Sequence, residues 1–146
     1  MREFAMVPLY TCKLVEQSTL LYNTQLSCAE AAKELFHNLL KDEPSEVMLE
    51  AYVDGCNKLI GVEVVSRGGI HGSALTPRDL LRGAFLMNAS AVIIGHNHPS
   101  GDPTLSEADH QMAKAVSAAF NMVGIMFLDS IVVTREGKFS SWLEEG

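Results

Sequence analysis

The spacing of apolar residues changes along the chain between the two-residue period of a strand and the 3.6-residue period of a helix. Helical spacing predicts three helices, over residues 27–41, 76–88 and 106–120. Strand-like runs predict strands over residues 9–15, 47–54, 59–66, 91–95, 124–128, 131–134 and 138–142. Strands mixed with helices indicate an α/β fold, in which helices flank a mixed β-sheet.

Turn and cap residues support these boundaries. Ser27 with Glu30 forms a capping box at the start of the first helix, and Thr76 followed by Pro77 marks the start of the second. The short polar stretch 55–58 predicts a hairpin between the strands on either side of it. A second hairpin is expected around residues 136–137.

The pattern also locates a candidate site. Residues 91–95 form a short apolar run, which is typical of a strand buried on both faces. A polar loop over 96–105 follows this strand and leads to Ser106 and Asp109, a capping box for the third helix. In α/β proteins the carboxyl end of a buried strand is a common place for ligands to bind.

With 146 residues and no evident linker, the chain has the length of one domain. We expect an N-terminal strand and extension over residues 1–26, followed by one domain over 27–146.

Charge and cysteine content exclude several classes of protein. Eighteen acidic and eleven basic residues give a net charge of −7, which disfavours direct nucleic-acid binding. The three cysteines are odd in number and widely spaced, so a disulfide framework is not expected. No signal peptide and no apolar run long enough for a bilayer span are evident, so no membrane partner is expected. We therefore expect a cytoplasmic protein.

Two histidines in the polar loop are the strongest candidates for chemistry. His96 and His98 are two residues apart, so in extended backbone both imidazoles point the same way. Asp109, in the first turn of the next helix, can supply a third metal ligand. Two histidines and a carboxylate leave the fourth position of a zinc ion to water, as catalytic sites require. The plainer alternative for Ser106 and Asp109 is the capping box alone, and the two roles are compatible.

A hydrolytic site also needs a base, and two acidic residues in the predicted strands compete for that role. Glu63 has apolar neighbours on both sides, so we expect it to be buried and to need a partner. That partner is either a metal-bound water or a backbone donor. Glu50 is the rival candidate, and we expect its side chain to face solvent.

Taken together, these residues resemble a known motif. His-x-His, then seven residues, then Ser-x-x-Asp, with an upstream strand glutamate, resembles the JAMM motif of the JAB/MPN+ metallopeptidases. The run HNHPSGDP, preceded by residues 76–79 and 88–91, is similar to the RadC branch of that family. The resemblance covers residues 27–146.

The resemblance implies a cytidine-deaminase-like JAB/MPN fold with one zinc ion. It implies that His96, His98 and Asp109 are the zinc ligands, that Glu63 is the general acid and base, and that Ser106 stabilises the oxyanion. Peptidases of the family cleave amide or isopeptide bonds, which implies a peptide or protein substrate.

The chain also departs from the RadC pattern. RadC proteins often carry a helix-hairpin-helix module, and we expect none within these 146 residues. Asp129-Ser130 stands where the family usually has Asp-His, and Gly68-Gly69 where it has Gly-Thr. The sequence alone assigns no role to His71 or to the loop over residues 67–75.

Two hypotheses follow. The first is a zinc-dependent hydrolase that acts on an amide bond. The alternative is a non-enzymatic accessory factor in DNA repair or mobile-element maintenance.

Overall fold

A computed structural model describes residues 2–19, 25–26, 28–68 and 75–145 of the chain. Its elements, in chain order, are α1 (Ala29–Leu40), β1 (Val47–Val53), β2 (Leu59–Arg67), α2 (Pro77–Leu86), β3 (Ala91–Asn97), α3 (Glu107–Met122), β4 (Met126–Val133), β5 (Phe139–Ser141) and α4 (Trp142–Glu145). In this part of the chain no helix is long and apolar enough to cross a membrane.

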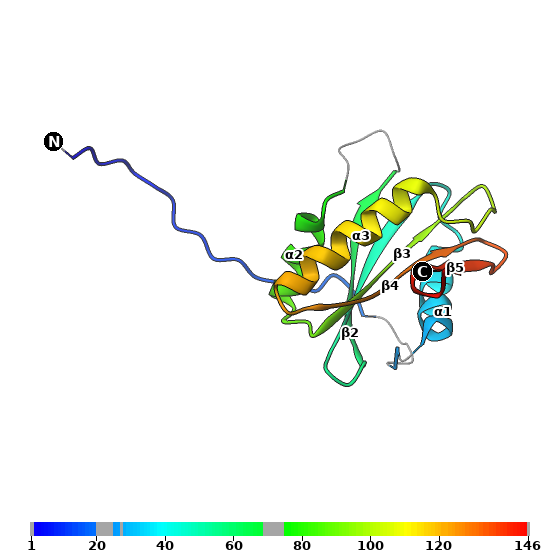
Figure 1. Cartoon of the computed structure of the whole chain (residues 1–146). Helices are drawn as coiled ribbons and strands as arrows, with labels where there is room; N and C mark the ends of the chain where they lie inside the picture. The colour runs from blue at the N-terminus through cyan, green and yellow to red at the C-terminus, as the bar shows by residue number, and fades with distance from the viewer. Residues whose placement is uncertain (1, 20–24, 27, 69–74, 146) are drawn as a thin grey trace.

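The strands form one five-stranded sheet in the order β2-β1-β3-β4-β5. β1 pairs antiparallel with both β2 and β3, β3 pairs parallel with β4, and β4 pairs antiparallel with β5. The parallel pair is connected through α3, as parallel neighbours require a crossover. The predicted mixed sheet flanked by helices is confirmed, and it is consistent with the JAB fold (Figure 1).

The core lies on both faces of this sheet because side chains alternate along each strand. On one face, α1 packs on a buried cluster that includes Val47, Leu49 and Ile93. On the other face, α2 and α3 pack on a cluster that includes Val92 and Ile94. β3 is buried along its whole length, as its apolar run predicts.

Gly95 allows α1 to approach β3 closely. A Cβ atom at this position would lie 2.3 Å from the ring of Phe36 in α1, a distance that real Cβ contacts do not show. The glycine therefore sets how tightly α1 packs against the strand end that carries His96.

Two strand predictions need correction. Residues 9–15 form no strand and are exposed, because no neighbouring strand among the described residues pairs with them. Residues 124–128 and 131–134 are not separate strands, since β4 runs through Asp129 and Ser130 without a break. Asp129 is buried within this strand, and it accepts hydrogen bonds from the Ser141 hydroxyl at 2.5 Å and from Leu143 N at 2.8 Å.

Two of the three predicted helix starts are confirmed. Thr76 and Ser106 are the N-caps of α2 and α3, each with a capping box. α1 begins after Cys28 as its N-cap, and Ser27, which was expected there, lies outside the described residues. Both predicted hairpins are present, since β2 follows β1 and β5 follows β4 as antiparallel neighbours.

Candidate metal centre

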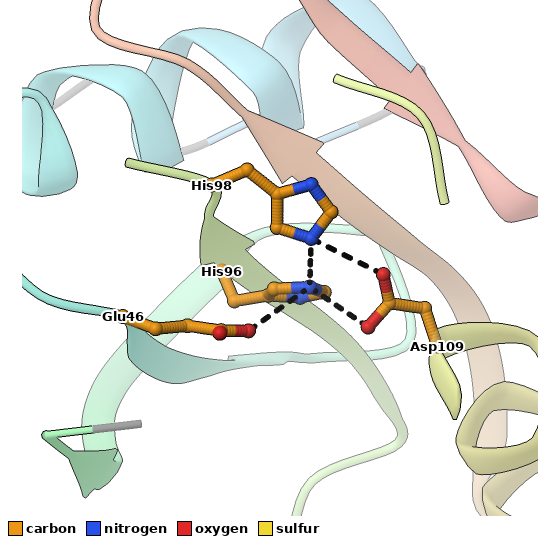
Figure 2. A group of neighbouring side chains, drawn as sticks. All are labelled: Glu46, His96, His98 and Asp109. Atoms are coloured by element: carbon orange, nitrogen blue, oxygen red, sulfur yellow. Dashed lines mark hydrogen bonds and ion pairs between the residues drawn. The ribbon is translucent and has the colours of Figure 1, made fainter. Parts of the chain in front are cut away.

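The side chains of His96, His98 and Asp109 converge at one end of the sheet (Figure 2). His96 lies near the end of β3, His98 directly follows that strand, and Asp109 lies in the first turn of α3. β3 and β1 are antiparallel neighbours, and Met48 pairs with His96. The start of β1 therefore lies beside the end of β3, and it brings Glu46 to the same place.

The distances between these groups fit a single metal ion. His96 Nε2 lies 3.2 Å from His98 Nε2 and 3.1 Å from Asp109 Oδ1, and His98 Nε2 lies 3.2 Å from Asp109 Oδ2. A tetrahedral zinc ion with bonds of about 2.0–2.1 Å separates its ligands by about 3.3 Å. Two imidazole nitrogens and a carboxylate also form a donor set that zinc accepts. The residues present therefore fit the predicted zinc ion.

Glu46 is the fourth member of the group, and the sequence interpretation missed it. Its Oε1 lies 3.6 Å from His96 Nε2, and its side chain is 27% exposed, whereas that of His96 is 2% exposed. One oxygen or nitrogen from each of the four residues lies within 4.8 Å of all the others. Glu46 is thus farther from His96 than Asp109 is, and it is more open to solvent.

Hydrogen bonds to the backbone orient two of the candidate ligands, His98 and Asp109, toward the centre. His98 Nδ1 lies 3.0 Å from the carbonyl oxygen of Asp102, which can only accept a hydrogen. Nδ1 therefore donates a hydrogen to this carbonyl, which leaves Nε2 as the nitrogen that faces the centre and that would bind a metal on losing its own hydrogen. Asp109 Oδ2 accepts a hydrogen bond of 2.8 Å from Ser106 N, which fixes the carboxylate in the capping box.

The carboxylate at the centre is held in its charged form. Burial opposes ionisation of Asp109, but hydrogen bonds from His96 and His98 outweigh it and keep its pKa well below the usual range. The hydrogen bond to Asp109 raises the pKa of His98, against the opposing effect of burial. A negative charge at Asp109 is the state that a metal cation requires.

Ser106 lies beside the centre and acts as the N-cap of α3. Its Oγ accepts a hydrogen bond of 3.1 Å from Asp109 N, which is the plainer of the two roles expected for it. This bond uses a lone pair of the hydroxyl and leaves its hydrogen to donate elsewhere.

Asn97, between the two histidines, fastens the backbone on both sides of Glu46. Its Oδ1 accepts a hydrogen bond of 2.7 Å from Val47 N, and its Nδ2 donates one of 3.0 Å to Ser45 O. Asn97 is 5% exposed; its bond with Val47 N is buried and its bond with Ser45 O is partly buried. One side chain thus joins the end of β3 to the start of β1.

Replacing Asn97 with alanine is expected to lower the free energy of unfolding by about 1–3 kcal/mol, because it leaves the buried Val47 N without its partner. Urea unfolding followed by circular dichroism measures this. Asn121→Ala, at an exposed position of α3, is the matched control and should change the free energy by no more than about 0.5 kcal/mol. Equal effects of the two substitutions would contradict the structural role of Asn97.

Glu63 is not part of the centre, and the expected burial of the two strand glutamates was wrong. Glu63 is exposed, whereas Glu50 is fully buried. Glu63 lies on the outer strand β2, and β1 separates it from β3. Because neighbouring strands are about 4.8 Å apart, this places its backbone roughly 10 Å to the side of β3.

Glu63 and Glu50 instead share a tyrosine. The Tyr52 hydroxyl lies 2.5 Å from Glu63 Oε2 and 2.7 Å from Glu50 Oε1. A phenol has one hydrogen to donate, so the second contact is a hydrogen bond only if one carboxyl group is protonated. Burial, together with the charge of Glu63 and against the effect of the Tyr52 hydrogen bond, raises the pKa of Glu50 to about 8. Glu50 is therefore the group that holds the proton.

The raised pKa predicts how stability changes with pH. The folded state holds the Glu50 proton more tightly than the unfolded chain, whose glutamates have their ordinary pKa of 4.5. This group therefore favours folding fully below about pH 4.5, and its contribution is lost as the pH rises to about 8, at up to about 1.4 kcal/mol per pH unit. Glu50→Gln should flatten this dependence in urea unfolding series at pH 5–8. The exposed Glu34→Gln serves as the control; a wild-type slope in Glu50→Gln would disprove the assignment.

The other positions singled out from the sequence either lie outside the described residues or do not belong to the group of candidate metal ligands. The predicted glycine-rich loop 67–75 is described only at residues 67, 68 and 75, and His71 lies outside the described residues. The three cysteines are unpaired and exposed, as expected from their spacing, and none belongs to the group of candidate ligands.

Comparison with known proteins agrees with this arrangement. The family model described as RadC-like JAB domain matches residues 26–146. Similar proteins include UPF0758 proteins of Haemophilus ducreyi (37% identical over 110 residues, 75% of this chain and 49% of the relative), Halorhodospira halophila (41% over 108 residues, 74% and 48%) and Xanthomonas euvesicatoria pv. vesicatoria (34% over 148 residues, 95% and 65%). The chain spans about half the length of the first two relatives, and the names of all three state no activity. The match over most of its length shows that the chain belongs to the RadC-like JAB domain family.

Proposed function

We propose that this chain is a zinc-dependent hydrolase that cleaves an amide or isopeptide bond in a peptide or protein. The observation that carries the proposal is the convergence of His96, His98 and Asp109 within 3.2 Å of one another, with Glu46 at their more exposed side. When bound, a zinc ion supplies a water nucleophile that is active at neutral pH.

The proposal assigns a separate task to each neighbouring side chain. His96, His98 and Asp109 would hold the metal. Glu46 would take a proton at its carboxylate from the attacking water and deliver it to the leaving nitrogen, as a general base and then a general acid. Its partial exposure and its longer distance from His96 support this role over that of a ligand.

The Ser106 hydroxyl supports the same reaction. It lies at the first turn of α3 next to Asp109, and its hydrogen is not used by the capping bond. It would donate to the oxygen on which negative charge develops during attack. Glu63, which the sequence resemblance assigned as acid and base, has no part in the proposal, since it lies two strands from β3.

The experiment is a comparison of the metal-free and the zinc-loaded chain on a peptide library and on isopeptide-linked substrates, with products identified by mass spectrometry. We expect cleavage by the zinc-loaded chain alone. If a chain that demonstrably holds zinc cleaves none of these substrates, the accessory-factor hypothesis becomes the better one. Because the net charge is −7, we propose no direct contact with nucleic acid.

A further inference from the structure

Asn97 lies at the point where the pairing between β1 and β3 stops. The antiparallel ladder of these two strands ends at the pair Met48 and His96, although β1 begins one residue earlier, at Val47, and β3 ends one residue later, at Asn97. In the same register the backbones of Val47 and Asn97 would form the next pair. Instead the backbone of Asn97 pairs with Val133 of β4, and its side chain accepts the hydrogen of Val47 N. The carboxamide of Asn97 therefore takes the place of the ladder where the two strands separate.

The two strand ends that separate here carry different parts of the candidate site. Glu46, the proposed base, directly precedes β1, whereas His96 and His98 are the two neighbours of Asn97 in the chain. The separation of the two strand ends therefore sets how far the Glu46 carboxylate lies from the metal ligands. Among the described residues this carboxylate pairs with one side chain, that of His96, at 3.6 Å. Its position thus depends mainly on the backbone that carries it.

The backbone around Glu46 is held by three hydrogen bonds. Two come from Asn97, whose Oδ1 accepts from Val47 N at 2.7 Å and whose Nδ2 donates to Ser45 O at 3.0 Å, so that they bracket Glu46. The third, of 3.1 Å, runs from Gly68 N, directly after β2, to Glu46 O. A carboxamide offers a lone pair and a hydrogen at the same time, so it can make both of the Asn97 bonds. Alanine would remove both of them, and aspartate would keep only the bond with Val47 N.

The candidate metal ligands are held in place by other contacts. The pairing of β3 with β4 places His96, and a hydrogen bond of 3.0 Å from His98 N to Val133 O continues this pairing past the end of β3. The capping box of α3 fixes Asp109. The two hydrogen bonds of the Asn97 side chain go to the backbone beside Glu46 and not to any of these three residues. Removing that side chain should therefore displace the base and leave the ligands where they are.

We propose that Asn97 is a positioning residue for hydrolysis, and that it acts by holding Glu46 at the distance from the metal ligands that proton transfer requires. This inference rests on the proposed function of the centre. Misplacing a reacting group by about 1 Å can lower a rate by about 100-fold, so we expect Asn97→Ala to lower kcat by about 10- to 100-fold. KM should change little, because the buried side chain of Asn97 is not open to a substrate. Zinc affinity should be unchanged, whereas the loss of an outer partner of a ligand would lower it about 10- to 100-fold.

A double-mutant cycle separates positioning from a general loss of structure. If Asn97 acts through Glu46, Asn97→Ala should lower kcat in the wild-type chain but not in a chain that already carries Glu46→Gln. Ser141→Ala is the matched control and should keep its kcat. The Ser141 hydroxyl is also buried and makes two hydrogen bonds, to Asp129 Oδ2 and from Glu144 N, but it lies on β5, two strands from β3. An equal further loss in the Glu46→Gln chain, or equal effects of Asn97→Ala and Ser141→Ala on kcat, would overturn the proposal.

Nuclear magnetic resonance of the metal-free chain tests the positioning without a substrate. A nuclear Overhauser effect between the Glu46 γ protons and the His96 ring protons reports the approach of Glu46 Oε1 to His96 Nε2, at 3.6 Å. We expect this signal in the wild type and in Ser141→Ala, and its loss in Asn97→Ala. Asn97→Asp, which keeps the bond with Val47 N, should weaken the signal, and it replaces Asn97→Ala if that variant does not fold.

A signal of wild-type strength in the folded Asn97 variant would overturn the proposal. Loss of the signal in a chain that binds zinc but cleaves no amide bond would have a different meaning. Asn97 would then still be the residue that positions Glu46, and only the proposed function would be refuted.

Discussion

Replacing Glu46 with glutamine is expected to lower the rate of amide hydrolysis by about 10²–10⁴-fold while the chain still binds zinc. Glutamine keeps the size and polarity of the side chain but cannot accept the proton that the carboxylate takes. Since Glu46 lies farther from His96 than Asp109 does, the metal should keep its three closer ligands. The measurement pairs initial rates on a cleaved substrate with the zinc content of the same preparations.

Glu63→Gln is the matched control for this prediction. The substitution is chemically identical, but Glu63 is exposed on β2 and hydrogen-bonded to Tyr52. We expect it to retain most of the activity. The opposite result, an inactive Glu63→Gln and an active Glu46→Gln, would restore the assignment made from the sequence resemblance.

Replacing His98 with alanine is expected to weaken zinc binding by more than about 100-fold, since even the loss of an outer partner of a ligand costs 10- to 100-fold. The remaining nitrogen and carboxylate cannot complete a tetrahedral site. Isothermal titration calorimetry of the metal-free chain with zinc measures the affinity. The fold should be preserved, because His98 lies in the loop that follows β3 rather than in the core.

His110→Ala is the control for this loss. His110 lies one residue after Asp109 on α3, but its Nε2 is directed to Glu145, at 3.7 Å, and not to the centre. The zinc affinity of His110→Ala should equal that of the wild type. Unchanged zinc affinity in His98→Ala would remove His98 from the ligand set.

Much of the fold could be predicted because the local signals agree with the packing. The apolar run of β3 is buried on both faces, and the capping boxes at Thr76 and Ser106 start their helices. Local signals also locate three candidate ligands. The HxH spacing brings His96 and His98 to the end of β3, and the helix start at Ser106 brings Asp109 to the same place.

Glu46 could not be found in this way, because its place in the centre depends on strand order. It precedes β1, and it lies beside His96 only because β1 runs antiparallel to β3 and Met48 pairs with His96. No local spacing in the sequence reports that pairing. Asn97 forms hydrogen bonds with the backbone of both neighbours of Glu46. From the sequence alone it is an ordinary polar residue between two histidines, and its role in positioning Glu46 follows only from the pairing of β1 with β3.

The reversed burial of Glu50 and Glu63 has a similar cause. Both residues lie in apolar strands and pair with each other across β1 and β2. Their environments differ because β1 is an inner strand and β2 is the outer one. The predicted strand over residues 9–15 was wrong for the complementary reason: the sequence has strand propensity there, but no strand among the described residues pairs with it.

X-ray absorption spectroscopy of the zinc-loaded chain tests the central claim, a metal centre built from His96, His98 and Asp109, most directly. The structure predicts two imidazole ligands and oxygen ligands at about 2.0–2.1 Å and no sulfur. A sulfur shell at about 2.3 Å would show that the exposed cysteines bind the metal instead, and it would contradict the proposed centre.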